Sequence, residues 1–166
     1  MTDRELMSIA KEASKNAYTP YSKFNVGAAL ECEDGTVFTG CNVENAALGS
    51  TICAERTACC KAVSEGHRKY SRIAIYGESK GYCMPCGSCR QFLAEFSPDM
   101  EVLCSRADGR YVSYKLSELL PHTFDYSRPL PPSAGQAVKS EVASTGVCQA
   151  KRKCSFASLY IKNPAL

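Results

Sequence analysis

The chain has 166 residues, of which 45% are hydrophobic and 22% charged, and its net charge is +3. This composition predicts one globular domain that can bury a core without disulfides, and the charge is too small to indicate a nucleic-acid partner. No run approaches the roughly 20 apolar residues of a membrane helix, and the charged start of the chain is unlike a signal peptide.

The apolar pattern predicts alternating helices and strands. Helical spacing, with Thr2 or Asp3 as the cap, supports a first helix, and Asp34-Gly35 is a hairpin signal between the first two strands. In chain order, we expect a helix at 2–17, strands at 24–32 and 36–43, a helix at 53–65, a strand at 72–76, a helix at 86–96, strands at 101–104 and 111–114, and a short helix at 116–120.

This order predicts a layered α/β sheet with a site at the junctions from strand to helix. The composition changes near residue 127, where a stretch rich in Pro, Ser and Gly begins a segment without periodicity. We therefore expect a catalytic domain over 1–126 and a mobile or surface-draped extension over 127–166. Its one basic run, 151–153, is more typical of a solvated or targeting patch than of a catalytic surface.

The chain has 11 cysteines, an odd number that cannot all pair within one chain. Without a signal peptide, they favour a reducing, cytoplasmic compartment, in which cysteines bind metal or act as small core residues. We expect core positions for five cysteines, namely Cys32, Cys41, Cys59, Cys60 and Cys104.

Two short motifs, Cys53-Ala-Glu55 and Pro85-Cys86-Gly-Ser-Cys89, begin the two central predicted helices. Helix N-termini offer free N–H groups and partial positive charge, which stabilise thiolates. Three thiolates would leave the fourth position of a tetrahedral zinc ion open for water, as a catalytic site requires. Glu55 is placed near such a metal without having to bind it, which suits a proton shuttle.

The spacing of these cysteines, taken alone, favours a catalytic zinc site no more than the other roles that such cysteines can have. A Cys-x-x-Cys pair also occurs as a redox pair, in structural zinc sites and in protein cores. A structural zinc site normally has four protein ligands, and Cys83 is a candidate for the fourth. His67 and His122 fall outside the motifs, and we expect both at the surface or in loops.

The zinc-dependent base deaminases have a two-part signature, which includes a three-cysteine variant. Its first part is a metal ligand, any residue and Glu, and its second part is Pro-Cys-x-x-Cys. Beyond this signature, the chain resembles the small homotetrameric cytidine deaminases over residues 5–125, in matching order and spacing. The matching segments are Tyr21-Ser-Lys-Phe24-Asn-Val-Gly-Ala-Ala, Gly40-Cys-Asn42-Val-Glu44-Asn45-Ala, Thr51-Ile-Cys53-Ala-Glu55-Arg56-Thr-Ala, Pro85-Cys-Gly-Ser-Cys-Arg-Gln91 and Leu119-Leu-Pro-His-Thr-Phe124.

The resemblance implies a three-layer α-β-α fold with a mixed five-stranded sheet. It implies zinc-dependent hydrolytic deamination of cytidine and 2'-deoxycytidine in pyrimidine salvage, with one zinc per subunit on Cys53, Cys86 and Cys89. Glu55 would take a proton from water and deliver protons to N3 and to the leaving amine. The resemblance further implies a cytoplasmic homotetramer with sites at subunit contacts and with no nucleic-acid or membrane partner.

The resemblance also assigns substrate contacts. Asn42 and Glu44 match residues that bind the ribose, Phe24 matches a ring that packs on the pyrimidine, and Ala54 matches a backbone contact to the base. Phe124 matches an aromatic residue that reaches into a neighbouring subunit's pocket. Each assignment has an ordinary alternative. Asn42 and Glu44 can simply belong to a polar loop, and Phe24 can be a core residue of its strand. The Phe124 ring can fold back on its own subunit.

Arg56 follows Glu55 directly. Zinc held by three thiolates carries a net negative charge, which makes it a poor electrophile, and an arginine bound to the sulfurs would withdraw charge. The alternative is a solvated arginine on the first turn of a helix.

Three rival functions share parts of this pattern. A polynucleotide deaminase needs basic and aromatic surface around its pocket, and this chain has no tryptophan. A blasticidin-type deaminase shares the zinc motif, but Asn42, Glu44 and Phe24 favour a nucleoside. A non-catalytic structural zinc module that binds proteins is the rival from another class.

Overall fold

The structure is a computed structural model that describes residues 1–125, which lie within one compact unit, Met1–Arg128. The predicted extension over 127–166 and its basic run lie outside the described residues. The elements in chain order are α1 (Asp3–Ser14), β1 (Val26–Cys32), β2 (Val37–Cys41), the short 3₁₀ helix η1 (Leu48–Ser50), α2 (Ala54–Ser64), β3 (Tyr70–Gly77), α3 (Gly87–Ala94), β4 (Glu101–Ser105), β5 (Tyr111–Lys115) and α4 (Leu116–Leu119).

The five strands form one mixed sheet in the order β2-β1-β3-β4-β5. β3 and β4 are parallel, and the other neighbours are antiparallel. The parallel pair needs a crossover, which α3 supplies, whereas the turn at Gly35 is enough for the antiparallel hairpin of β1 and β2.

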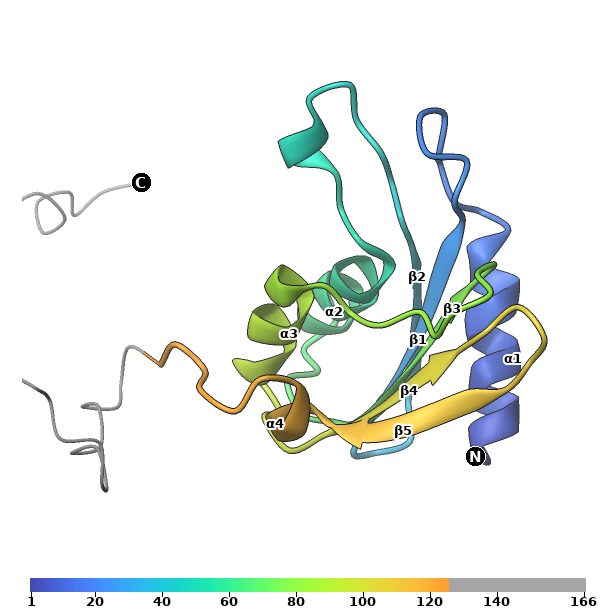
Figure 1. Cartoon of the computed structure of the whole chain (residues 1–166). Helices are drawn as coiled ribbons and strands as arrows, with labels where there is room; N and C mark the ends of the chain where they lie inside the picture. Colours follow the sequence, from blue (N-terminus) through green and yellow to red (C-terminus); the bar gives the residue numbers. More distant parts are fainter. Residues whose placement is uncertain (126–166) are drawn as a thin grey trace, which may run out of the picture. The chain divides into compact units, whose positions relative to one another are not determined.

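Helices cover both faces of the sheet (Figure 1). Alternate residues along a strand point to opposite faces, so each inner strand feeds two cores. One core joins the sheet to α1, and its buried members are Leu6, Met7, Ala10, Ala29, Ala74, Tyr76 and Leu103. The other joins it to α2 and α3, and its buried members include Leu30, Ala58, Ile73, Ile75, Leu93 and Val102. The predicted three-layer α-β-α fold with a mixed five-stranded sheet is therefore confirmed.

The first helix is shorter than the predicted 2–17. It begins with Thr2 as the N-cap, in a reciprocal capping box with Glu5, and it ends at Ser14. The backbone of Tyr18 bonds to the backbone of Asn42 and Glu44, at 3.0 and 2.8 Å, instead of continuing the helix. Sheet-like pairing with a distant segment thus ends α1 three residues early.

The cysteines with a described environment are all free thiols. Cys32, Cys59 and Cys104 are buried, as predicted, but Cys60 is exposed, so the prediction of a core position for it was wrong. Neighbouring helix residues point about 100° apart, so Cys59 and Cys60 cannot both face the sheet. Cys41 is only partly buried because it ends β2, which lies at the edge of the sheet.

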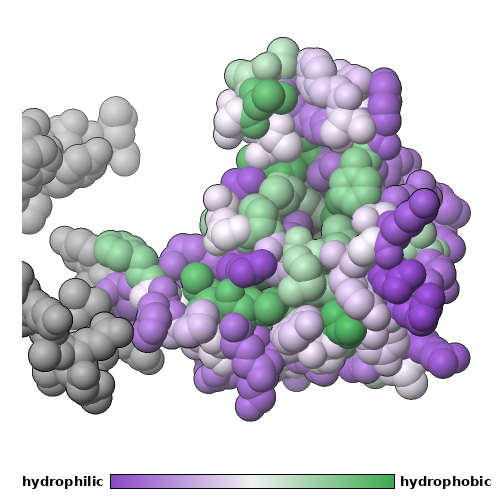
Figure 2. Space-filling view, viewed as in Figure 1, coloured by the Kyte–Doolittle hydropathy of each residue, from purple (hydrophilic) through white to green (hydrophobic). Residues whose placement is uncertain are grey.

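The connection from β2 to α2 projects beyond the sheet and carries η1 (Figure 1). A bridge between Val43 and Ile52 closes this segment at its base. Its apolar side chains Val43, Leu48 and Ile52 are exposed, Leu48 to 72%, and Figure 2 shows green, apolar surface on the projection. Among the described helices, none has the length and apolar character of a membrane span.

Candidate metal centre

The N-termini of α2 and α3 bring three cysteines together. Cys53 is the N-cap of α2, Cys86 is the N-cap of α3, and Cys89 lies in the first turn of α3. Their three sulfur atoms lie within 4.8 Å of one another, and the sulfurs of Cys53 and Cys86 are 3.8 Å apart. The two motifs, 33 residues apart in the chain, thus form one cluster.

Local backbone structure explains why these thiols face one another. Both N-cap residues have extended backbones, with ψ of 155° at Cys53 and 166° at Cys86, and neither side chain caps its own helix. The thiols remain available to each other at the two helix ends where unpaired N–H groups and the helix dipoles favour negative charge.

The cluster favours a thiolate at Cys53. Hydrogen bonds from Cys89 and then from Arg56 and Cys86 lower the pKa of the Cys53 thiol to about 5, against the effect of burial. The bond to Cys53, together with burial, raises the pKa of Cys89. The first thiolate therefore forms at Cys53, and a bound cation would supply the charge that stabilises the other two.

The donor set fits zinc. Thiolates are ligands that zinc prefers, and three of them leave one tetrahedral position for water or substrate. Cys89 is fully buried and Cys86 is exposed, so the cluster is closed on one side and open on the other. Cys83, the alternative fourth ligand, is not in the group, and burial raises the pKa of its thiol to about 11.

Glu55 lies on the first turn of α2 and is only 4% exposed. Burial raises the pKa of its carboxyl to about 7, and the negative charge of Cys53 contributes in the same direction. A carboxyl group with this pKa can both accept and donate a proton near neutral pH, which is the property that general acid–base catalysis needs.

Arg56 contacts the cluster directly. Its Nη2 donates to the Cys53 sulfur at 3.6 Å and to the carbonyl oxygen of Thr51 at 3.1 Å. The hydrogen bond to Cys53 raises the pKa of the guanidinium, which remains charged. Thr51 belongs to a segment that matches the family, but its contact with Arg56 could not be predicted, because no motif shows that a backbone carbonyl will orient a side chain five residues later.

Asn42 and Glu44 brace the loop before β1. The Asn42 amide donates to the Phe24 carbonyl and accepts from the Val26 N–H, both at 2.9 Å. One Glu44 carboxylate oxygen accepts from the N–H groups of residues 21 and 22, at 3.0 and 3.2 Å. The predicted ribose-binding pair therefore fixes the segment that carries Phe24, whose ring lies outside β1 and is half-buried.

Gly77, at the end of β3, is a further residue that the sequence analysis missed. A Cβ atom at this position would lie 2.9 Å from Cζ of Phe24 and 2.7 Å from the sulfur of Cys83. Both contacts are too short for real atoms, so the glycine lets the Phe24 ring and Cys83 pack against the end of the strand.

Ala54 and Phe124 differ in their surroundings. Ala54, between Cys53 and Glu55, is fully buried. Phe124 is 73% exposed, although its backbone N–H and C=O both bond to the Gln91 side chain, at 3.0 and 2.8 Å. Phe124 therefore lies largely at the surface and outside the buried core.

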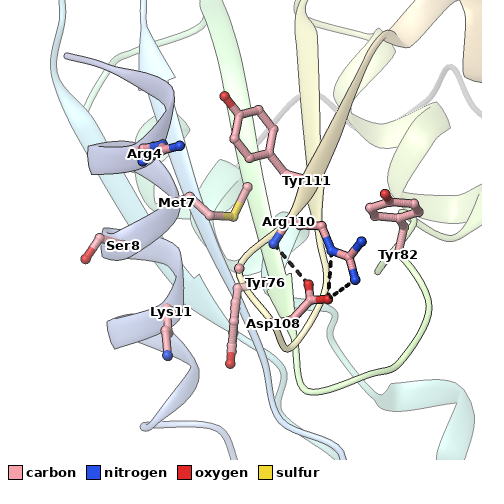
Figure 3. Close-up of a pocket in the computed structure, with 10 residues that line it drawn as sticks. Arg4, Met7, Ser8, Lys11, Tyr76, Tyr82, Asp108, Arg110 and Tyr111 are labelled. Carbon is pink, nitrogen blue, oxygen red and sulfur yellow. Dashed lines mark hydrogen bonds and ion pairs between the residues drawn. The ribbon is translucent and has the colours of Figure 1, made fainter.

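A pocket of about 660 Å³ opens elsewhere, between α1, the loop after β3 and the β4–β5 turn. In Figure 3, Tyr76 and Tyr82 line it, and Arg110 is paired with Asp108, at 2.7 Å. No predicted site residue lines this pocket, and Tyr76 belongs to the core on the α1 side of the sheet. The chemistry of the cysteine cluster therefore identifies the site, and the volume of this pocket does not.

Three thiols and a buried glutamate at two meeting helix N-termini match the metal ligands and the proton-transfer glutamate that characterise the zinc-dependent base deaminases as a class. The family described as "Cytidine and deoxycytidylate deaminase zinc-binding region" matches residues 1–105. The chain belongs to this family, as its resemblance in the sequence indicated.

Relatives with known names agree. A cytidine deaminase of Sporosarcina psychrophila is 46% identical over 75% of this chain and 92% of its own length, and one of Halalkalibacterium halodurans is 48% identical over 74% and 94%. The crystal structure of a Burkholderia pseudomallei cytidine deaminase matches with a TM-score of 0.73 at 46% identity, over 75% of this chain and all of that one. A Mycobacterium tuberculosis cytidine deaminase structure gives 0.66 at 38% identity, over 75% and 99%.

Proposed function

We propose that the chain catalyses the hydrolytic deamination of cytidine and 2'-deoxycytidine to uridine and 2'-deoxyuridine, with release of ammonia, in cytoplasmic pyrimidine salvage. The observation that carries this proposal is the buried Glu55 beside three thiols that fit one zinc ion per subunit. Zinc, when bound, would supply an activated water for attack on C4 of the base. The names of the relatives support cytidine as the substrate.

In this reaction Cys53, Cys86 and Cys89 hold the metal and Glu55 moves the protons. Glu55 accepts one proton from the attacking water and delivers it to N3. It then accepts the proton of the hydroxyl formed at C4 and delivers it to the departing amine, so that ammonia leaves and the C4 carbonyl of uridine remains. A carboxyl with a pKa of about 7 suits both directions of transfer. The backbone at Ala54, between the ligand and the proton shuttle, contacts the base edge.

Arg56 adjusts the charge of the metal centre. Its guanidinium hydrogen-bonds the Cys53 sulfur and withdraws negative charge from a zinc ion held by three thiolates. The carbonyl of Thr51 holds the same guanidinium nitrogen in place.

Phe24, Asn42 and Glu44 recognise the nucleoside. The Asn42 amide keeps one donor and one acceptor position beyond its two backbone bonds, and the Glu44 carboxylate has about four acceptor positions, more than its bonds from residues 21 and 22 use, so both can still bind ribose hydroxyls. The loop that they brace presents the Phe24 ring, which packs on the pyrimidine. A site that binds a free ribose favours a nucleoside as the substrate over a polynucleotide. A buried carboxyl group beside the metal favours an enzyme over a structural zinc module.

The active unit is a homotetramer in which Phe124 completes the pocket of a neighbouring subunit. The exposed Phe124 ring and the exposed apolar residues of the projecting segment, Val43, Leu48 and Ile52, support this assembly. Burial of apolar side chains at about 25 cal/mol per Å² drives such contacts.

Replacement of Glu55 by Gln tests the reaction. Loss of a general acid–base group costs about 10²- to 10⁴-fold in rate, and the loss should reach or exceed the upper end because this residue serves several transfers. The fall of ultraviolet absorbance on a panel of cytidine, 2'-deoxycytidine and oligonucleotides measures turnover, and elemental analysis measures zinc.

Glu65→Gln, at the other end of the same helix, is the matched control and should retain full activity. Near-normal turnover of Glu55→Gln would overturn the mechanism. Turnover of oligonucleotides alone would favour a polynucleotide deaminase, and no turnover by metal-replete wild type would favour the structural module.

A further inference from the structure

A second cluster of metal-binding side chains lies away from the catalytic centre. Single donor atoms of Cys32, Asp34 and His67 lie within 4.8 Å of one another. Cys32 ends β1, Asp34 lies in the following turn, and His67 follows the C-terminal end of α2. Cys53 caps the opposite end of this helix, whose 11 residues span about 16 Å, so the two clusters are separate.

The donor atoms of Asp34 and His67 are already close to the separation that a metal requires. Oδ2 of Asp34 lies 3.1 Å from Nδ1 of His67. Two such ligands at about 2.0 to 2.1 Å from a tetrahedral zinc ion are roughly 3.3 Å apart. Binding therefore requires only a small opening of this pair.

Neighbouring groups orient both side chains. Oδ1 of Asp34 accepts from the Thr36 N–H at 2.9 Å, which leaves Oδ2 for the histidine. The His67 ring packs on Phe38 with centroids 5.1 Å apart, and this contact restricts its rotation. Such supporting contacts are typical of metal ligands because they reduce the freedom that is lost on binding.

A Cys-His-Asp group can also form a catalytic triad, but this one is unsuited to that role. Cys32 is only 2% exposed, and burial raises the pKa of its thiol to about 11. A nucleophilic cysteine requires access to its substrate and a lowered pKa. A metal ligand requires neither, because the cation supplies the charge that displaces the proton.

We propose that Cys32, Asp34 and His67 bind a second zinc ion, with water as the fourth ligand. One sulfur, one imidazole nitrogen and one carboxylate oxygen form a mixed set that zinc accepts and that magnesium and calcium do not favour. The partly exposed Asp34 and His67 give the ion a path from solvent. The ion clamps the β1–β2 turn to the segment after α2, and the proposal is independent of the catalytic function.

Zinc content of the full chain, without an added histidine tag, tests the proposal. Wild type, Asp34→Asn, His67→Gln and His122→Gln are each loaded with zinc, desalted and subjected to elemental analysis. Wild type and His122→Gln should retain one more zinc ion per chain than Asp34→Asn and His67→Gln. Asparagine can still accept from the Thr36 N–H, so Asp34→Asn keeps the turn. Equal zinc content in all four proteins would overturn the proposal.

Imidazole nitrogen NMR of the wild type is a second measurement. The chain has only two histidines. Zinc should shift Nδ1 of His67 and leave His122 unchanged, and a titration that shifts neither or both would overturn the proposal. The same spectrum of Cys53→Ser separates the two sites, because this variant loses the cysteine-cluster zinc but should keep the response of His67.

Discussion

At the scale of single residues, the role that we propose for Arg56 is to adapt a three-cysteine zinc site to hydrolysis. Its replacement by Gln removes the positive charge at the Cys53 sulfur, so the metal becomes a weaker electrophile. Loss of a residue that supports a metal ligand typically costs about 10- to 100-fold in activity or metal affinity. We expect kcat for cytidine to fall by this factor while zinc, measured by elemental analysis, stays bound.

Arg68→Gln is the control for that experiment. Arg68 is an exposed arginine that follows the C-terminal end of α2, so its replacement changes the net charge equally without altering the cluster. Equal kinetics of both variants, with zinc present, would show that Arg56 has no influence on the metal.

The position of the three cysteines at two helix starts could be predicted from local sequence patterns, and helix N-termini favour thiolates there. That the three cysteines form one ligand set was implied by the family resemblance, because their spacing alone left other roles open. The bracing of residues 21–26 by Asn42 and Glu44, and the proximity of Cys32 to His67, depend on tertiary contacts. No local pattern in the chain reports such contacts.

At the scale of elements, Gly40 in β2 sets the distance between the sheet and α2. A Cβ atom there would lie 2.3 Å from the Ala54 carbonyl oxygen and 2.5 Å from the Ala58 N–H nitrogen, both in the helix backbone. Gly40→Ala must push the helix outward, and such overpacking costs about 1 to 3 kcal/mol. Thermal unfolding should show a lower Tm.

Gly81→Ala provides the matched control because its added Cβ atom would meet only the Ser79 hydroxyl oxygen, at an ordinary 3.8 Å. The shift of α2 in Gly40→Ala also moves Ala54, next to Cys53, so zinc retention should weaken together with stability. A Tm equal to that of Gly81→Ala would contradict the proposed role of this contact.

The start of α1 gives a pH-dependent prediction. Hydrogen bonds from the Thr2 backbone and hydroxyl lower the pKa of Glu5 below its ordinary value of 4.5. The unfolded chain therefore takes up this proton first, and the stabilisation is present above pH 4.5 and lost as pH falls through the folded pKa. Glu5→Ala should lower Tm at neutral pH and change it less at about pH 3. An equal difference at both pH values would exclude an ionised cap.

The order of helices and strands could be predicted from periodicity and turn signals, whereas the residues at which several of these elements end could not. The edge position of β2, the exposure of Cys60 and the early end of α1 all depend on which segment pairs or packs with which. The three-layer arrangement came from the family resemblance, because alternating elements alone predict only a layered sheet.

At the scale of the whole molecule, the proposed site is incomplete in one subunit. Phe124, which would cover the base, is exposed, and the projecting segment presents Val43, Leu48 and Ile52 to solvent. Large apolar side chains gathered beside a site are typical of a surface that contacts another chain. The proposed homotetramer would bury them and close the pocket.

Mixing two inactive variants tests this shared site. Glu55→Gln lacks the proton shuttle, and Phe124→Asp puts a charge where the pocket needs a ring. If Phe124 acts on a neighbouring subunit, tetramers reassembled from both variants will contain some pockets with an intact Glu55 and an intact Phe124, and cytidine turnover should partly return. Tetramers of either variant alone, taken through the same reassembly, serve as controls and should stay inactive.

The milder substitution Phe124→Ala measures how much the aromatic contact contributes to substrate binding. An aromatic contact contributes roughly 0.5 to 1.5 kcal/mol beyond burial, so Phe124→Ala should raise KM by about 2- to 13-fold, with a smaller effect on kcat and none on zinc content. In the proposed site the ring acts on substrate binding, whereas the metal would lie at the N-termini of α2 and α3 of the subunit that owns the pocket. Light scattering on the same samples gives the assembly state, and a monomer with full activity would refute both the homotetramer and the shared pocket.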